Sequence, residues 1–307
     1  MDYYNKKYVV HEIIKLSTDR DFSALSKSGA NIRALRVKCL FDFERALKVI
    51  NWEKNKQNLY VGCSKLKDIP NFTFNPKNRS SETSEWFRNE YNNQIQSYDL
   101  FFDFDKCLKC SCGLTENSEN GLKRNGDKFF CGKCQKELNK EEMITATIEE
   151  VRIDAKILKD YLDEYNIPYS IIFSGNKGFQ VVIDGEYLEI EKIELGNVYP
   201  HKIIQENIKK MLNLEYCDSA NVGISSRLRK LPYSLVSNGE ENETEMNVAL
   251  PLDDFQFEGF KLENVKLKSV LSSIKLIRRG NLERFQNLSF EEKRKNLKSF
   301  IRLFEFR

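Results

Sequence analysis

Two aspartates one residue apart close an apolar run in the first half of the chain. The run reads Tyr98-Asp-Leu-Phe-Phe-Asp-Phe-Asp105 and is typical of a buried strand. Because strand side chains alternate, Asp103 and Asp105 point to the same face, where two like charges repel. A divalent cation would relieve the repulsion, and Mg²⁺ binds one or two carboxylates together with substrate phosphates. The pair predicts a metal-dependent nucleotide site, unless it is a strand end with two solvated acids.

Four cysteines follow this strand in two Cys-x2-Cys pairs. Cys107 and Cys110 form the first pair, Cys131 and Cys134 the second, and twenty residues separate the pairs. This spacing indicates a tetrahedral Zn²⁺ site. Cys112 is a surplus thiol that could substitute for Cys110. Because four thiolates leave no open position for a substrate, we expect the zinc to be structural.

A glycine-containing segment lies between two apolar β runs at 168–185, a pattern that predicts a hairpin. It reads Phe173-Ser-Gly-Asn-Lys-Gly-Phe-Gln180. Glycines let backbone N–H groups approach a phosphate, and here Ser174 adds a donor and Lys177 a charge. The alternative is a plain hairpin turn, which Asn-Lys-Gly would also make.

A third acid, Asp218, ends another short apolar run, and a basic segment begins nine residues later. In a strand, Arg227 and Arg229 would share one face and Lys230 would take the other, unless Pro232 bends the chain. Such cations suit a triphosphate or a nucleic-acid backbone. The alternative is a solvent-facing edge strand that Pro232 blunts.

The remaining patterns predict the elements that hold these residues. We expect a strand that runs into an amphipathic helix over 35–52, a strand over 58–66, a loop over 68–84, helices over 147–165 and near 199–212, and a short strand in 246–252. Ser289 and Glu292 have capping-box spacing. Leu297, Phe300, Ile301 and Phe304 would then form one apolar stripe. Strands mixed with helices, without regular alternation, indicate an α+β fold with a mixed or antiparallel sheet.

Composition gives the general class. With 307 residues, 40% hydrophobic and 31% charged, the chain can bury a core as one large or two smaller domains. It has no apolar stretch that would cross a bilayer and no signal-peptide pattern, so we expect no membrane partner, an intracellular location and reduced thiols. The isolated Cys39, Cys63 and Cys217 then read as core residues. From Lys275 onward the chain carries an excess of basic residues, which suits a polyanion, an acidic partner or a solvated helical face.

Taken in order, these segments resemble the catalytic (small) subunit of archaeal and eukaryotic DNA primases, in the archaeo-eukaryotic primase (primase-polymerase) superfamily. Leu100-Phe-Phe-Asp-Phe-Asp105 matches the family's first motif, and the cysteines follow as its zinc module does. Ser174-Gly-Asn-Lys-Gly-Phe-Gln180 is similar to its Ser-Gly-x-x-Gly-x-His motif. Asp218 with the basic segment to Val236 is similar to its third motif. The resemblance covers residues 30 to 255.

The resemblance implies a primase that makes short RNA or DNA primers on single-stranded DNA from NTPs or dNTPs, by two-metal nucleotidyl transfer. It further implies a catalytic core over 1–106 and 141–255, a zinc-binding insertion over 107–140, and a helical region over 256–307. A separate large subunit is expected as a partner. The expected location of the protein is the cytoplasm or nucleoid of a prokaryote such as an archaeon. The implied ligands of two Mg²⁺ or Mn²⁺ ions are Asp103, Asp105 and Asp218. The implied nucleotide contacts are Ser174, Gly175, Asn176, Lys177, Gly178, Gln180, Arg227 and Lys230.

Two residues depart from the family pattern. Gln180 and Val236 stand where the family has histidines, and an amide can accept or donate a hydrogen bond but carries no charge. Two other functions stay open: a gap-filling repair polymerase of the same superfamily, and a non-catalytic zinc-ribbon protein that binds nucleic acid. The C-terminal helices could dock a large subunit, hold the template, or pack on the chain's own core.

Overall fold

The computed structural model describes residues 3–25, 31–55, 58–70, 85–108, 110, 112, 114, 121–125, 128–187, 200–218, 227–237, 243–272 and 284–305. Most of the predicted loop over 68–84 and part of the basic C-terminal segment lie outside these ranges. Within them the fold is α+β with antiparallel sheets, as the sequence predicted. The helices are η1 (Tyr3–Asn5), α1 (Lys7–Ser17), α2 (Leu40–Val49), α3 (Trp52–Asn55), α5 (Tyr91–Gln94), α6 (Lys140–Glu164), η2 (Gly185–Tyr187), α7 (Pro200–Met211), η3 (Glu243–Glu245), α8 (Asp254–Glu258), η4 (Leu262–Val265), α9 (Leu267–Ser272) and α10 (Phe290–Glu305).

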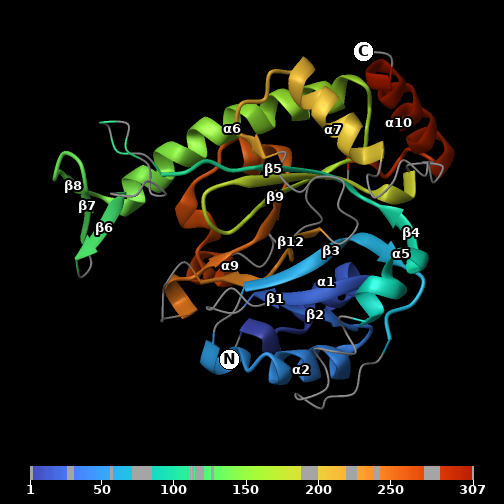
Figure 1. Ribbon diagram of the computed structural model, residues 1–307, viewed down its shortest axis with the longest axis horizontal. Helices are drawn as coiled ribbons and strands as arrows, with labels where there is room; N and C mark the ends of the chain where they lie inside the picture. The colour runs from blue at the N-terminus through green and yellow to red at the C-terminus, as the bar shows by residue number, and fades with distance from the viewer. Residues whose placement is uncertain are drawn as a thin grey trace.

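Two five-stranded sheets carry the described part of the chain. The first sheet has the order β12-β3-β1-β2, with β4 also paired to β3, and the second has the order β11-β5-β10-β9-β15. In Figure 1 the second sheet lies beneath α6 and α7, and the first sheet lies above α2. The strands of the first sheet are β1 (Arg20–Leu25), β2 (Asn31–Leu35), β3 (Asn58–Leu66), β4 (Ile95–Tyr98) and β12 (Leu228–Lys230). Those of the second are β5 (Leu100–Phe104), β9 (Ser170–Phe173), β10 (Phe179–Ile183), β11 (Cys217–Asp218) and β15 (Leu250–Leu252).

Two smaller sheets complete the described fold. A three-stranded sheet of β6 (Leu122–Asn125), β7 (Lys128–Cys131) and β8 (Glu137–Leu138) projects from the body beside the start of α6 (Figure 1). A short ladder joins β13 (Leu235–Val236) to β14 (Asn247–Val248). Across the described helices, none is long and apolar enough to span a bilayer.

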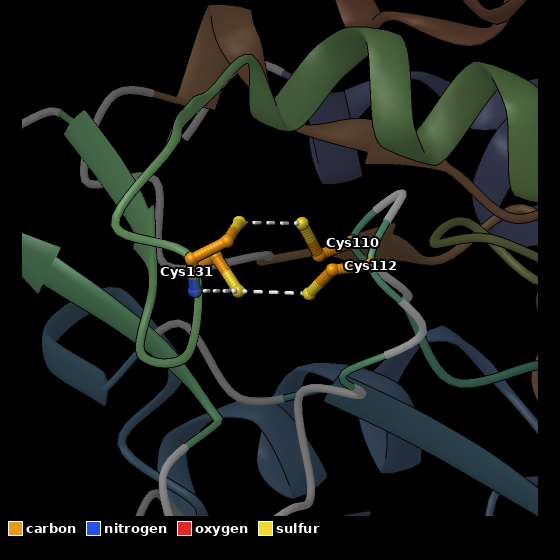
Figure 2. A group of neighbouring side chains, drawn as sticks. Cys110, Cys112 and Cys131 are labelled. Atoms are coloured by element: carbon orange, nitrogen blue, oxygen red, sulfur yellow. Dashed lines mark hydrogen bonds between the residues drawn. The ribbon is translucent and has the colours of Figure 1, made fainter.

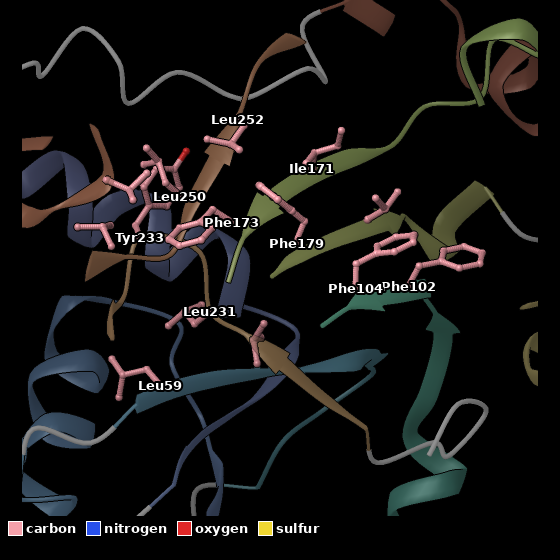
Figure 3. Packing of buried hydrophobic residues seen from close by; sticks show 14 of the residues in the cluster. Leu59, Phe102, Phe104, Ile171, Phe173, Phe179, Leu231, Tyr233, Leu250 and Leu252 are labelled. Carbon is pink, nitrogen blue, oxygen red and sulfur yellow. The ribbon is translucent and has the colours of Figure 1, made fainter. Parts of the chain in front are cut away.

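The main apolar cluster of the core contains residues of both large sheets. Aromatic side chains of the second sheet fill its centre, among them Phe104, Phe173 and Phe179, each fully buried. Figure 3 shows that these buried side chains are followed by Leu231 and then by Leu59 of the first sheet. The two sheets are therefore held together by shared apolar contacts, not only by the chain that connects them.

The predicted strand over 98–105 is instead two strands in different sheets. β4 ends at Tyr98 and pairs with β3, whereas β5 begins at Leu100 and pairs with β10 and β11. Asp99 lies at the crossing with 1% of its surface exposed. Its carboxylate accepts from Arg20 Nη2 at 2.9 Å and from the Gly185 N–H at 3.1 Å. A buried acid needs such partners, so the chain turns here to reach them.

The predicted short strand in 246–252 divides in the same way. β14 pairs with β13, while β15 pairs with β9 of the second sheet. Both predictions identified extended chain correctly and missed the change of partner strand. An apolar run cannot reveal such a change, because each half is equally suited to a buried sheet.

The C-terminal helix packs on the chain's own core. Its capping box is present, because the Glu292 N–H donates to Ser289 Oγ at 3.2 Å and the Ser289 N–H donates to Glu292 Oε2 at 2.7 Å. Leu297 and Phe300 are fully buried, and Ile301 is 9% exposed. The stripe therefore packs on the chain's own core, which was one of the predicted alternatives. The side chain of Phe304 lies outside the described residues.

Candidate active site and metal centre

The strand register of the second sheet places three predicted site residues in one row. Asp103 on β5 lies directly opposite Asp218 on β11 and directly opposite Gln180 on β10. Directly opposed residues of an antiparallel ladder project to the same face with their Cβ atoms about 5 Å apart. The row Asp218–Asp103–Gln180 is thus fixed by backbone hydrogen bonds between segments that are distant in sequence.

Asp103 is the most perturbed member of this row. Gln180 Nε2 donates to its Oδ1 at 3.4 Å. Burial raises the pKa of the Asp103 carboxyl to about 6; Arg227 opposes the rise, whereas Asp105 and Asp218 add to it. The ionised carboxylate is therefore destabilised in the folded chain, as expected for a group that is completed by a cation.

Gln180 is nearly inaccessible, with 4% of its surface exposed. Its Oε1 is buried and has no hydrogen-bond partner within the described part of the chain. The Gln180 amide is therefore in contact with Asp103 and still has an unused acceptor.

Arg227 connects the two large sheets at the acidic row. Its Nη2 lies 3.7 Å from Asp103 Oδ2 and 3.8 Å from Asp218 Oδ2. The residue directly precedes β12, and its carbonyl accepts from the Cys63 N–H on β3. Its guanidinium supplies the positive charge between two carboxylates that a divalent ion would otherwise supply.

Asp105 lies just past the end of β5 and is exposed. Its N–H donates to the Tyr216 carbonyl at 3.1 Å, which continues the β5–β11 ladder by one step. The Lys106 N–H donates to its Oδ1 at 2.7 Å. Among the described residues, Asp103, Asp105 and Asp218 do not form a group already close enough to hold an ion, which agrees with the position of Arg227 between two of them.

The glycine loop closes against the end of β5. The Ser174 N–H donates to the Gly178 carbonyl at 3.0 Å and completes the turn between β9 and β10. A Cβ at Gly178 would lie 2.1 Å from the Phe104 carbonyl oxygen, so only glycine permits this approach. Asn176 and Lys177 are half-buried at the turn. The loop therefore lies beside Asp105, on the edge of the sheet that carries the acidic row.

Gly175 is the second constrained glycine of this loop. It has a φ of 86°, and a Cβ there would lie 2.2 Å from Val236 Cγ2. Val236 is 1% exposed, and Asn247 Nδ2 donates to the Gly175 carbonyl at 3.1 Å. Val236 is thus a packing partner of the loop.

The basic segment divides among three environments. Arg229 is 5% exposed and its Nε lies 3.6 Å from Asp99 Oδ2, so a solvent-facing edge strand does not describe it. Lys230 Nζ lies 3.1 Å from the Tyr60 hydroxyl and 4.4 Å from the centre of its ring. Burial lowers the pKa of Lys230 to about 7, against the attraction of Asp103. Arg227 and Lys230 contribute charge near the acidic row, whereas Arg229 stabilises the crossing at Asp99.

Sequence reasoning missed Tyr60, Asp99, Asp154 and Tyr216. Asp99 was visible as an acid inside an apolar run, which is a signal for a buried, paired carboxylate. Tyr60 carried no such signal, because an aromatic residue in a strand is ordinarily a core residue. Asp154 on α6 accepts from the Tyr216 N–H at 2.6 Å. Nothing local to either residue predicts that contact.

Four cysteines form a cluster that could hold a metal ion, and this set differs from the predicted one by one residue. The sulfur atoms of Cys110, Cys112, Cys131 and Cys134 all lie within 4.8 Å of one another. Cys107 lies outside this group, and Cys112, predicted as a substitute for Cys110, joins Cys110 in its place. Cys107 directly follows Asp105 and Lys106 at the end of β5, which keeps it with the body of the fold. Spacing alone could not distinguish the two pairings.

The geometry of this cluster fits zinc. Sulfur pairs on Zn²⁺ with bonds of about 2.3 Å lie roughly 3.8 Å apart in a tetrahedron. The Sγ atoms of Cys110 and Cys134 are separated by 3.6 Å, and those of Cys112 and Cys131 by 3.4 Å (Figure 2). The Cys134 N–H donates to Cys131 Sγ at 3.5 Å and lowers the pKa of that thiol to about 6. This favours the thiolate that a metal binds.

The three isolated cysteines do not all behave as predicted. Cys63 and Cys217 are buried, as expected for core residues. The prediction for Cys39 is wrong: it is exposed at the N-cap position of α2, where an extended backbone with a φ of −152° turns it out of the core.

Comparisons with known proteins give little further information. No protein-family model matches the chain, and no curated protein matches it in sequence. A solved structure that it resembles is the polymerase domain of Mycobacterium tuberculosis ligase D in complex with DNA. The similarity covers 92% of this chain and 89% of that one, with a TM-score of 0.48 and 12% sequence identity. Similarity at this level assigns neither a family nor an activity.

Proposed function

We propose that this chain is a metal-dependent nucleotidyltransferase of the primase-polymerase kind, which copies single-stranded DNA. One observation carries the proposal: the β5 register sets Asp103 directly opposite Asp218, and the glycine loop closes on the same strand end. A purely structural sheet gains nothing from opposing two acids, since like charges across a ladder are destabilising. The sequence resemblance to DNA primase catalytic subunits supports the same assignment.

The acidic row would hold the ions. Asp103, Asp105 and Asp218 are the proposed ligands of two Mg²⁺ or Mn²⁺ ions, which would activate an attacking 3′-hydroxyl and neutralise the leaving pyrophosphate. Oxygen donors of this kind suit both ions. Because Arg227 now neutralises Asp103 and Asp218, it must release them when the ions and a nucleotide bind. Released, its guanidinium is well placed to pair with a phosphate.

The surrounding residues would position the triphosphate. In the glycine loop, Ser174, Asn176 and Lys177 offer hydroxyl, amide and ammonium donors, while Gly175 and Gly178 bring the backbone close to β5. Lys230 adds charge from the first sheet, and Gln180 donates to Asp103. In-line positioning and charge neutralisation supply most of the rate in this class of reaction. NTPs or dNTPs are the proposed substrates, and a separate large subunit is the proposed protein partner.

The test uses the purified chain with a single-stranded DNA template, Mg²⁺ or Mn²⁺, and NTPs or dNTPs in separate reactions. Asp103→Asn and Asp218→Asn should each abolish product formation, whereas Asp160→Asn, an exposed acid on α6, should not. Full activity of Asp103→Asn would refute the assignment. A dinucleotide formed on an unprimed template identifies a primase, and extension of a supplied primer alone identifies a gap-filling polymerase.

A non-catalytic function has one observation in its favour. Arg227 already pairs with both acids of the row, so they need no metal to be neutralised. A zinc-ribbon protein of this kind would bind DNA with no dependence on Mn²⁺ and would form no product with any nucleotide. Mn²⁺-dependent nucleotide binding that Asp103→Asn removes would exclude it.

A further inference from the structure

Contacts through Tyr216 join the acidic row to helix α6, and the cysteine cluster lies along the chain between the end of β5 and the start of that helix. We propose that a metal held by the four cysteines fixes the placement of Asp105 and Asp218. Asp154 and Lys106 are the positioning residues, because both hold Tyr216, which contacts one of these acids and lies two residues before the other. This inference rests on the proposed function, because it concerns the same carboxylates. It adds a role for the cysteine centre and names residues that no motif contains.

Tyr216 is the centre of these contacts. Its N–H donates to Asp154 Oδ2 at 2.6 Å, and its carbonyl accepts from the Asp105 N–H at 3.1 Å. The ammonium of Lys106 lies 3.0 Å from its hydroxyl and 4.3 Å from the centre of its ring. Tyr216 directly precedes β11, the strand that opposes β5, and stands two residues before Asp218. A movement of Tyr216 would therefore displace both Asp105, its hydrogen-bond partner, and Asp218, which lies two residues further along the chain.

Helix α6 supplies the other side of the contacts. Asp154 is 6% exposed, and Glu150 pairs with the Lys106 ammonium. The two acids are four residues apart, so they lie on one face of the helix, one turn from each other. Both the segment after Asp105 and the segment before Asp218 are thus bound to the same face of α6.

The four cysteines lie in the segment that joins the end of β5 to the start of this helix. Cys110 follows Asp105 by only five residues, and Cys134 precedes the N-cap of α6, Asn139, by the same number. The Asn139 side chain accepts from the N–H groups of Glu141 and Glu142. A metal bound by Cys110, Cys112, Cys131 and Cys134 would close the loop between β5 and α6. Without it, the helix start and the strand end are joined by a long insertion.

The first experiment measures Mn²⁺ binding to the zinc-loaded full chain by isothermal titration calorimetry. Asp154→Ala removes the acceptor for Tyr216 N–H and should weaken Mn²⁺ binding roughly tenfold, the lower end of the effect of losing a supporting partner at a metal site. Asp154→Asn keeps an acceptor oxygen and should stay within about threefold of the wild type. Asp160→Ala, which removes an exposed acid from the same helix, should bind as the wild type does. Unchanged binding by Asp154→Ala would overturn the inference.

The second experiment measures amide hydrogen exchange and does not depend on the proposed function. Chelation of the cysteine-bound metal, or Cys112→Ser, should speed exchange at Tyr216 and Asp105, while amides of β10 such as Val181 stay protected. Asp154→Ala with the metal in place should also speed exchange at Tyr216 and at Asp105, which donates to the Tyr216 carbonyl. If the wild type bound no Mn²⁺, the proposed function would fail, and exchange would still decide the linkage. Equal exchange at Tyr216 before and after chelation would refute it.

Discussion

Asp103 and Asp218 face each other across the β5–β11 ladder, although more than a hundred residues separate them in the sequence. The side chain of Asp103 is 24% exposed and that of Asp218 is 42% exposed, with Arg227 between them. A sheet with two acids in directly opposed positions is less stable than one with neutral residues there. Such a loss in the free energy of unfolding is expected where residues serve function rather than stability.

Asp103→Asn should abolish nucleotidyl transfer and stabilise the fold. The carboxyl has a pKa of about 6 in the folded chain against 3.8 as its ordinary value, so at pH 7 the folded state holds an unfavourable charge. Removing that charge should raise the free energy of unfolding by about 1–2 kcal/mol, discounted for partial exposure. Urea denaturation at pH 7 measures it, with the exposed Asp105→Asn as the comparison. A clear loss of stability would contradict this account.

Arg227→Ala should change metal and nucleotide binding in opposite directions. Removing the competing guanidinium should tighten Mn²⁺ binding by about threefold, the value of a partly screened ion pair. Losing a charged donor to phosphate should weaken nucleotide binding by about tenfold. Calorimetric titration of each ligand distinguishes this from a simple structural role, in which both affinities would fall together.

Gly178→Ala should destabilise the fold strongly. The added Cβ would meet the Phe104 carbonyl oxygen at 2.1 Å, and neither backbone can move without breaking the β5–β10 pairing. We expect a loss of about 3 kcal/mol in the free energy of unfolding, at the upper end of overpacking effects. Gly259→Ala is a suitable control, because its Cβ would approach its nearest neighbour only to 3.3 Å. Equal stabilities of the two variants would show that the loop does not close on β5.

His201→Gln should remove part of the acid sensitivity of the fold. Burial lowers the pKa of His201 to about 4 from 6.5. Below pH 6.5 the unfolded chain takes up a proton that the folded chain refuses, so stability present above pH 6.5 is lost as the pH falls toward 4. The full effect is about 3 kcal/mol. From pH 7 to pH 4 the free energy of unfolding of the wild type should fall by about 3 kcal/mol more than that of His201→Gln. An equal fall in both proteins would contradict this prediction.

Local sequence patterns correctly predicted the elements that carry the site. The hairpin around the glycine loop, the helices α6 and α7 and the capping box at Ser289 all follow from short-range periodicity and turn chemistry. The spacing of the cysteines likewise predicted a cluster that could hold a metal ion. The hairpin, the helices and the capping box depend on residues close together in the sequence, whereas the two cysteine pairs are separated by twenty residues.

Pairing between distant segments was not predictable, and tertiary structure alone decided it. The sequence contained three acids, a basic segment and five clustered cysteines; the fold determined that Asp218 opposes Asp103, that Arg227 lies between them, and that Cys112 replaces Cys107. It also divided the apolar run at Asp99 between two sheets, because a buried carboxylate there required Arg20 and the Gly185 N–H. The physical reason is that a ladder register and a buried ion pair depend on the chain's global path, which no local window of sequence contains.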